Sequence, residues 1–476
     1  MPRAPMPAHD ESAAANGVAA AQALARWILS IDGACLRADA VHQAKLLLLD
    51  SIGCAFAGRD EPVCRAVLAV CAEAGRSGPC TIIGTRQKTD AARAALANGV
   101  LARVLDLNDY VVGGAKGVPE IGGHPSDNIP VALAIGECRG RSGRDVLAAI
   151  VVGYEIYGRL KTLMDRSGPW DGVTVSGVVA PAIAGRLMKL DEDRLAHALA
   201  LGGARAATPA IVRRGGISAA KSIANALVAE SGVAAALLAE QGVTGPLAVL
   251  EDDLGLRSVF PNGDIGAVLT AALPDESYIM RSNIKAYPCL ATGQSAVAAA
   301  IGLHAGIGGA VGTIARIEVT MADYPFLQHQ QHDPGRVRPS SREAADHSFQ
   351  FLIAAALTDG AFGPAQFEGR RWSDPAIVAL MERIVMRTDP AWNARAPGSY
   401  PCAVRVVDVA GRERSVEVPY PPGYSRGGIA AAEAIDKFHS VTAAALDRDR
   451  RERIVAAVLD FDRDATADRL TATLAA

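Results

Sequence analysis

The spacing of apolar residues changes once along the chain, and this change limits the folds open to it. From residue 18 to about residue 275 the apolar positions follow helical spacing of three, four or seven, as in Val41, Ala44, Leu48, Ile52 and Ala55. That run places one stripe of a helix against a core, and Gly58 is expected to end the helix. Segments 146–158, 176–189 and 217–241 are rich in alanine and glycine, which let helix axes approach closely. The sequence therefore predicts a multi-helix domain.

Beyond Asn283 strands are expected as well as helices. Apolar positions that alternate with polar ones, the period of a half-buried strand, occur in three runs: Ile317, Val319 and Met321; Val404 and Val406; Val416 and Val418. The last two runs flank a turn that contains Gly411 and predict a hairpin. Residues 349–357, between these strands, follow helical spacing. This region is expected to be a smaller α+β unit inserted into the helical one.

These patterns predict a mainly α fold in which both ends of the chain belong to the large all-helical domain. The first seventeen residues mix proline, histidine and acidic residues where a secretory signal would need an apolar core, so we expect a disordered arm there. The tail beyond Ala430 returns to helical spacing. The expected division is arm, 1–17; helical domain, 18–280; α+β domain, 281–423; and second part of the helical domain, 424–476.

Composition narrows the class of protein further. The 476 residues are 50% hydrophobic and 21% charged, as in packed globular proteins. The 48 Lys+Arg against 51 Asp+Glu give a net charge of -3, so no nucleic-acid or membrane partner is expected. The longest uncharged stretch is too polar for a transmembrane helix. Eight cysteines form no C-x-x-C pair and no zinc-type spacing, which favours a cytoplasmic protein without a metal site or an iron–sulfur cluster.

Ionisable residues gather between residues 98 and 126. Asp106, Asp109 and Tyr110 precede a glycine-rich loop at residues 113–117, and His124 and Pro125 follow it. One interpretation is an acid/base cluster at the end of a helix, in which Asp106 and His124 move protons. The other is structural, with the carboxylates capping a helix and His124 in a loop. The loop lacks the spacing of a phosphate-binding loop, so it either covers a pocket or simply turns.

Lys221 lies early in a long alanine-rich helix, just after Arg213 and Arg214. A cation near a helix N-terminus opposes the helix dipole, so it needs an anion or solvent beside it. A carboxylate-binding lysine fits that requirement, and so does a surface lysine lying over alanines.

Lys285 and Tyr287 lie where the chain leaves the helical domain, and ligand clefts are frequent at domain junctions. The structural alternative is a linker with a Tyr-Pro turn. Tyr324, which also precedes a proline, has the same two interpretations. In the run DHS at residues 346–348, Asp346 or Ser348 is expected to cap the helix that follows.

Together these stretches resemble the MmgE/PrpD family, over nearly the whole chain. The resemblance is seen in LDSIGCAFAG at 49–58, in NG at 98–99 through LD at 105–106 to HPS at 124–126, and in GYEIYG at 153–158. Further along it is seen in Lys221, the run 232–245, KAYP at 285–288, DHS at 346–348 and LTDG at 357–360. Each motif is modest alone, but their order and spacing are shared with the family.

The resemblance implies a large helical domain with a smaller α+β lid, usually as a homodimer. It also implies a cofactor-independent site between domain and lid, where Asp106, the position of Tyr110, His124 and Lys221 match residues that family members use. Relatives also contribute a tyrosine from the lid, for which Tyr324 is the candidate.

The chain departs from the family in two places. Many relatives have a histidine before the helix that begins near Val175, where this chain reads WDGVT at residues 170–174, with Asp171. Relatives often place another histidine soon after the KAYPC run, where this chain reads LATGQS at 290–295. The segment between Asp109 and His124 is also longer and richer in glycine than expected. These departures prevent transfer of a substrate from any one member.

The resemblance implies a lyase that removes a proton α to a carboxylate of a small polycarboxylate, by default a 2-methylcitrate-like hydroxy acid. Such a reaction needs cations and donors for the developing charge, which Lys221, Lys285 and His124 can supply, and a base, which Asp106 or a histidine would be or would orient. We expect Tyr110, Lys285, Tyr287 and Asp171 to bind the substrate. The alternatives are a decarboxylase or an epimerase on the same scaffold, and a non-catalytic carboxylate-binding protein.

Overall fold

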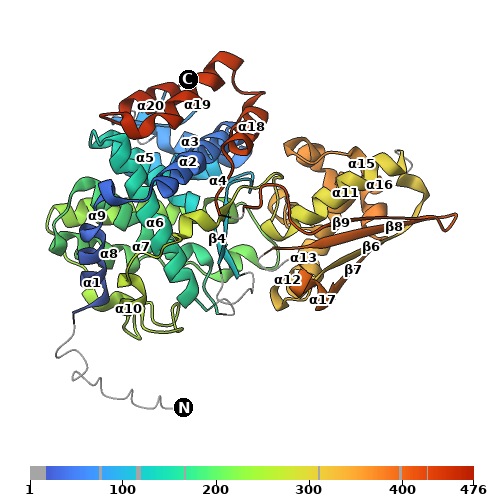
Figure 1. The fold of residues 1–476 in the computed structure, drawn as a ribbon, viewed down its shortest axis with the longest axis horizontal. Helices are drawn as coiled ribbons and strands as arrows, with labels where there is room; N and C mark the ends of the chain where they lie inside the picture. The colour runs from blue at the N-terminus through green and yellow to red at the C-terminus, as the bar shows by residue number, and fades with distance from the viewer. Residues whose placement is uncertain are drawn as a thin grey trace, which may run out of the picture.

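Two lobes make up the molecule in the computed structural model, which describes residues 18–73, 78–113, 120–165, 168–308, 311–395, 399–425 and 427–476 (Figure 1). The larger buried apolar cluster draws on residues 20–284 and 429–474, so both parts of the chain build it. A second cluster draws on residues 289–406 and includes Tyr110. The expected arm at residues 1–17 and most of the glycine-rich loop at 113–117 lie outside the described residues.

The helical unit holds the larger cluster. Its helices are α1 (Ala20–Ser30), α2 (Ala38–Gly58), α3 (Pro62–Glu73), α4 (Ala91–Arg103), α5 (Ile129–Cys138), α6 (Gly143–Leu163), α7 (Ser176–Met188), α8 (Glu192–Gly203), α9 (Ala220–Glu240), α10 (Ile265–Thr270), α18 (Ala431–Thr442), α19 (Arg448–Leu459) and α20 (Asp468–Leu474). Helix α9 packs against α4, α7 and α8, and α18 packs against α2. The predicted helix through Val41 is confirmed as α2, which ends at Gly58.

Small residues set how closely these helices approach, as the sequence predicted. A Cβ atom on Gly99 of α4 would lie 3.0 Å from the Cβ of Ala226 in α9, and one on Gly232 of α9 would lie 2.7 Å from the Cβ of Ala180 in α7. A larger side chain at either glycine would push the helices apart. The close approach of α4 and α9 brings the end of one helix beside the start of the other.

The α+β unit contains the second cluster. Its helices are α11 (Gln294–Ile307), α12 (Pro325–His332), α13 (Pro334–Val337), α14 (Arg342–Ala345), α15 (Phe349–Asp359), α16 (Pro375–Met381) and α17 (Ala391–Arg395). Its strands are β6 (Ile314–Ala322), β7 (Ile384–Asp389), β8 (Cys402–Asp408) and β9 (Glu413–Val418), in the order β7-β6-β8-β9. Strand β7 runs parallel to β6, the other neighbours are antiparallel, and α11 contacts β8, β9 and α15. The expected strand at 314–321, the hairpin and the helix at 349–357 are confirmed.

Two small sheets in the helical unit were not predicted. One pairs β1 (Cys80–Thr81) with β2 (Lys88–Thr89), and the other has the order β4-β3-β5, from β3 (Tyr110–Gly113), β4 (Glu120–Gly123) and β5 (Ser282–Asn283). Strands of two to four residues are too short to show a period of two. The fold is nevertheless mainly α, as expected.

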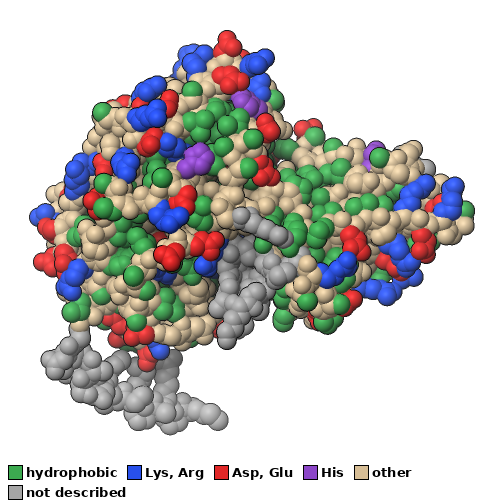
Figure 2. Space-filling view, in the orientation of Figure 1, with side chains coloured by type: hydrophobic (Ala, Val, Ile, Leu, Met, Phe, Trp, Pro, Cys, Tyr) green, Lys and Arg blue, Asp and Glu red, His purple; other side chains and the backbone are tan. Residues whose placement is uncertain are grey.

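Charged side chains of both signs are interspersed over the visible face of both lobes (Figure 2), which agrees with the net charge of -3. One helix among the described residues, α9, is long and apolar enough by length and composition to cross a membrane. Within the fold, 61% of its apolar window is buried. Core helices of soluble proteins have the same properties, so α9 is weak evidence for a membrane span.

Candidate active site

The turn after α4 places Asp106 inside the molecule. The Asp90 side chain caps the start of α4 by accepting a hydrogen bond from the Arg93 amide, and the helix ends at Arg103. Asp106 follows with a φ of 52°, in the left-handed region that residues other than glycine rarely adopt, and it is only 1% exposed. Unfavourable backbone geometry of this kind is concentrated at functional sites.

Three cations hold the Asp106 carboxylate. Its Oδ1 lies 2.5 Å from both Arg103 Nη1 and Lys285 Nζ, and its Oδ2 lies 3.2 Å from Lys221 Nζ. Lys285 Nζ also donates to the Asp106 carbonyl oxygen at 2.9 Å. Although burial opposes the charged form, these cations lower the pKa of Asp106 well below its ordinary value. A carboxylate held this way is a weak base, so the geometry favours an orienting role for Asp106.

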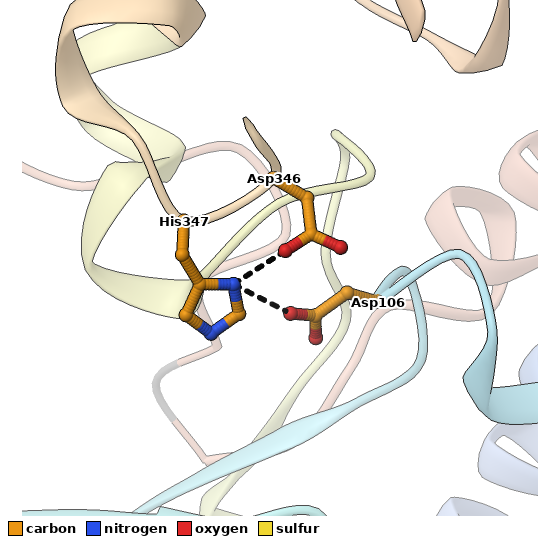
Figure 3. Close-up of side chains that lie close together, drawn as sticks. All are labelled: Asp106, Asp346 and His347. Carbon is orange, nitrogen blue, oxygen red and sulfur yellow. Dashed lines mark hydrogen bonds and ion pairs between the residues drawn. The ribbon is translucent and has the colours of Figure 1, made fainter. Parts of the chain in front are cut away.

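Lys221 joins this carboxylate to a second one from the other unit. Its Nζ donates to Asp346 Oδ1 at 2.7 Å and Oδ2 at 2.9 Å, and lies 3.3 Å from His347 Nδ1. Asp346 and His347 lie between α14 and α15, and Figure 3 shows the His347 ring with Nδ1 turned toward both carboxylates. The alternative of a surface lysine does not hold, because Lys221 is 2% exposed.

Asp106, Asp346 and His347 also have the spacing of a metal site, since one ligand atom of each lies within 4.8 Å of the others. The Lys221 ammonium lies within 3.3 Å of an atom of each. As arranged, the three side chains therefore surround the Lys221 ammonium.

His124 lies near the other carboxylate oxygen of Asp106 from the one that His347 faces. Its Nδ1 lies 2.5 Å from the Asp109 carbonyl oxygen, which can only accept, so Nδ1 carries the proton and Nε2 the lone pair. That Nε2 is 3.9 Å from Asp106 Oδ1. Burial, and then the charges of Arg103 and Lys285, lower the pKa of His124 well below its ordinary value. His124 is therefore a neutral imidazole at neutral pH.

Asp109 supports this arrangement from within the core. Its Oδ1 accepts from Ser126 Oγ at 2.5 Å, and its Oδ2 accepts from the Tyr154 hydroxyl at 2.8 Å. Burial nevertheless raises the pKa of Asp109 to about 7. The folded state therefore binds this proton more tightly than the unfolded chain, in which the pKa is about 3.9.

This shift predicts a pH-dependent stability that Asp109→Asn removes. Because the pKa is raised on folding, the wild type is expected to lose stability relative to D109N as pH rises from about 4 to about 7. Urea-unfolding midpoints of both proteins across this range measure the effect. Parallel curves for the two proteins would contradict the raised pKa.

A cavity of about 200 Å³ opens between the two units beside these groups. On the helical side Asp106, His124, Asp171 and Arg213 line it, together with Lys285 from the junction. The α+β side contributes Leu290, Ala291, Thr292, Gln330 and His347. The volume suits a small polar ligand, and the wall carries both signs of charge.

Of the eight residues selected from the sequence, the structure brings five together. Asp106, His124, Lys285 and Asp171 line the cavity, and Lys221, which is not among the lining residues, contacts Asp106. Asp171 accepts a hydrogen bond from Arg213 Nε at 2.9 Å. This chain therefore has an ion pair at the place where the family resemblance leads us to expect a histidine.

The three tyrosines selected from the sequence, Tyr110, Tyr287 and Tyr324, are not among the residues that line this cavity. Tyr110 is fully buried in β3, and its hydroxyl has no hydrogen-bond partner among the described residues. Tyr287 packs against the core of the α+β unit. Tyr324, which directly precedes α12, stacks on Phe326 with ring centroids 5.6 Å apart, and Gln330 of α12 lines the cavity instead.

Sequence reasoning missed Asp346 and His347 as site residues. The capping prediction was correct for Ser348, whose side chain accepts from the Phe351 amide, but it assigned no role to His347. The available signal was two consecutive ionisable residues directly before a buried apolar helix. Arg103 and Arg213 were also missed, because a single arginine in a helix or loop has no distinctive pattern.

Models of two domains of one protein family match this chain. The MmgE/PrpD N-terminal domain matches residues 22–266 and the MmgE/PrpD C-terminal domain matches residues 287–462. A 2-methylcitrate dehydratase from Salmonella typhimurium is 28% identical over 469 residues, which cover 89% of this chain and 90% of the relative. A 2-methylcitrate dehydratase from Cupriavidus necator is also 28% identical, over 471 residues, with the same coverage.

A cis-aconitate decarboxylase-like protein from Aspergillus oryzae is 24% identical over 491 residues, which cover 95% of this chain and 96% of the relative. Both family domains therefore match in order, and relatives named for two different reactions align over nearly their full length. On these matches the chain belongs to the MmgE/PrpD family.

Proposed function

We propose that this protein is a cofactor-independent lyase that removes a proton α to a carboxylate of a small di- or tricarboxylate. Dehydration of a 2-methylcitrate-like hydroxy acid is the first candidate reaction, because relatives named 2-methylcitrate dehydratase align over 90% of their length. The observation that carries the proposal is the cavity wall, where buried cations lie beside neutral imidazoles.

The chemistry of the wall suits such a step. Removing a proton α to a carboxylate transfers negative charge onto that carboxylate, and the Lys285 ammonium lies in position to stabilise it. A neutral imidazole can accept the proton. Low solvent content between the two units would strengthen these interactions.

Decarboxylation of a cis-aconitate-like acid is the second candidate. The Aspergillus oryzae relative named cis-aconitate decarboxylase-like aligns over 95% of this chain, more than the dehydratases do. Both reactions pass through a carbanion-like state beside a carboxylate, so the same cations would serve either one.

Proton NMR of the chelator-treated protein in D₂O tests the proposal. The panel comprises 2-methylcitrate, citrate, cis-aconitate, and substituted malates and succinates. A new alkene signal with release of water identifies a dehydratase, and loss of carbon dioxide identifies a decarboxylase. Deuterium uptake without net conversion identifies an epimerase. Binding of an acid with no C–H exchange or conversion of any of them would instead support a carboxylate-binding protein.

A further inference from the structure

His347 is a buried titratable group that the proposed chemistry leaves without an assigned step. It comes from the α+β unit, between α14 and α15, whereas Asp106 and His124 come from the helical unit. The residue is 8% exposed, and it lines the cavity. A substrate between the two units would therefore meet this imidazole directly.

The contacts of Nδ1 decide which ring nitrogen carries the proton. Asp346 Oδ1 lies 2.5 Å away, and Asp106 Oδ2 lies 3.7 Å away. The third neighbour, Lys221 Nζ, lies farther from Nδ1, at 3.3 Å, and makes shorter hydrogen bonds of 2.7 to 3.2 Å to Asp346 and Asp106. Since a carboxylate can only accept, the proton lies on Nδ1, and Nε2 has a free lone pair.

The ring is neutral before the reaction, and the carboxylate beside it favours its protonated form. Burial, and then the charge of Lys221, lower the pKa of His347 to about 4, so the ring is neutral at neutral pH. The groups that face Nδ1 are Asp346 from the same loop, Asp106 after α4 and Lys221 of α9. A carboxylate that accepts from Nδ1 stabilises the imidazolium that forms when Nε2 takes a proton.

His124 lacks this support. Its Nδ1 contacts the neutral carbonyl oxygen of Asp109. The charges that act most strongly on the ring are those of Arg103 and Lys285, and both disfavour its protonated form. Of these two imidazoles, His347 has the carboxylate partner that a catalytic base needs.

We propose that His347 is the catalytic base of this site and that Asp346 is its positioning residue, an inference that rests on the proposed lyase function. The C–H bond α to the substrate carboxylate breaks, its proton goes to Nε2, and its electron pair moves onto the carboxylate. In a dehydration, that pair then forms the C=C bond while hydroxide leaves and takes the proton from Nε2 as water. The imidazole ends neutral and no other reactant is needed.

Substitution of His347 with glutamine (H347Q) tests the proposal, because glutamine keeps a donor toward Asp346 but has no basic lone pair. We expect the rate of C–H exchange and kcat to fall by about 10²- to 10⁴-fold, with substrate still bound in saturation-transfer NMR. The matched control is His304→Gln. His304 lies in α11 of the same unit, is half-buried, and contacts the Leu357 carbonyl oxygen rather than the cavity. H304Q is expected to retain the wild-type rate.

Asp346→Asn tests the positioning role through the pH profile. Asp346 raises the pKa of His347, so its loss is expected to shift the acid limb of kcat/KM to lower pH and to reduce kcat. A purely structural role would lower the amount of folded enzyme without moving that limb. An unmoved limb in D346N would therefore remove Asp346 from the mechanism.

Imidazole ¹⁵N NMR supplies a readout that does not depend on turnover or on the stability of a variant. In the wild type, the His347 signals, assigned with H347Q, are expected to show the Nδ1–H tautomer and a pKa well below 6.5. The Nε2–H tautomer would overturn the inference. Exchange at the wild-type rate in H347Q would overturn the role of His347 as the base but not the lyase proposal. Absence of both exchange and conversion in the wild type with every acid it binds would overturn the lyase proposal and the base with it.

Discussion

Substitution of Lys221 with methionine (K221M) is expected to abolish turnover and to lower the free energy of unfolding by about 3–5 kcal/mol. The ammonium is the shared partner of Asp106 and Asp346, and both carboxylates are 1% exposed or less. Without it, two buried anions would face each other, and His347 would lose its fixed position. Urea unfolding and the D₂O exchange assay measure the two effects.

Two further variants distinguish the effect of Lys221 on turnover from its effect on stability. Lys45 is also buried and pairs with Asp462 at 2.5 Å, but it does not line the cavity, so K45M is expected to lose stability while keeping its turnover per folded molecule. In the double variant K221M/D346N one of the uncompensated charges is gone, so stability is expected to recover in part and activity is not. Full activity in K221M would contradict the assignment of Lys221 to the site.

Substitution of Lys285 with methionine (K285M) is expected to lower kcat/KM by about 10²- to 10³-fold, the usual cost of losing one donor that stabilises developing negative charge. Lys285 is fully buried and lines the cavity, and among the described residues it donates two hydrogen bonds, both to Asp106. Its third N–H is available to a substrate carboxylate. Steady-state kinetics on the acid identified by NMR gives the measurement.

Lys285→Arg is the matched variant that keeps the charge and changes the shape of the side chain. The charge is kept, but a planar guanidinium does not fit the place of a compact ammonium, so K285R is expected to recover little of the lost rate. Rates in K285M within a few-fold of the wild type would show that the charge of Lys285 does not act on the reacting carboxylate.

Much of the fold was predictable because it depends on local patterns. Apolar spacing gave α2 and its end at Gly58, and the alternation of β6 and of the β8–β9 hairpin gave the strands of the α+β unit. A cap at Asp346 or Ser348 was expected from their place before an apolar run, and Ser348 is the cap. The strands β1 to β5 were not predicted, because their pairing joins short segments whose sequences have no period.

The candidate site was predictable only in part. The sequence, with its resemblance to the family, selected Asp106, His124, Lys221 and Lys285, which are in contact or line the cavity. It could not show which of Tyr324 and Gln330, two residues of one short segment, lines the cavity, because the direction of a side chain depends on the packing around it. Tyr324 stacks on Phe326, and Gln330 reaches the cavity.

The sequence by itself determined the helical domain, the longer strands of the α+β unit and the family that the chain resembles. Only the tertiary structure decided what the ionisable groups do. Asp106 and Asp346 are separated by 240 residues, yet one ammonium joins them. The roles of Asp106 and His347 follow from these contacts, because burial and neighbouring charges set the pKa of each group. Neither the burial nor the neighbouring charges can be read from a residue's place in the chain.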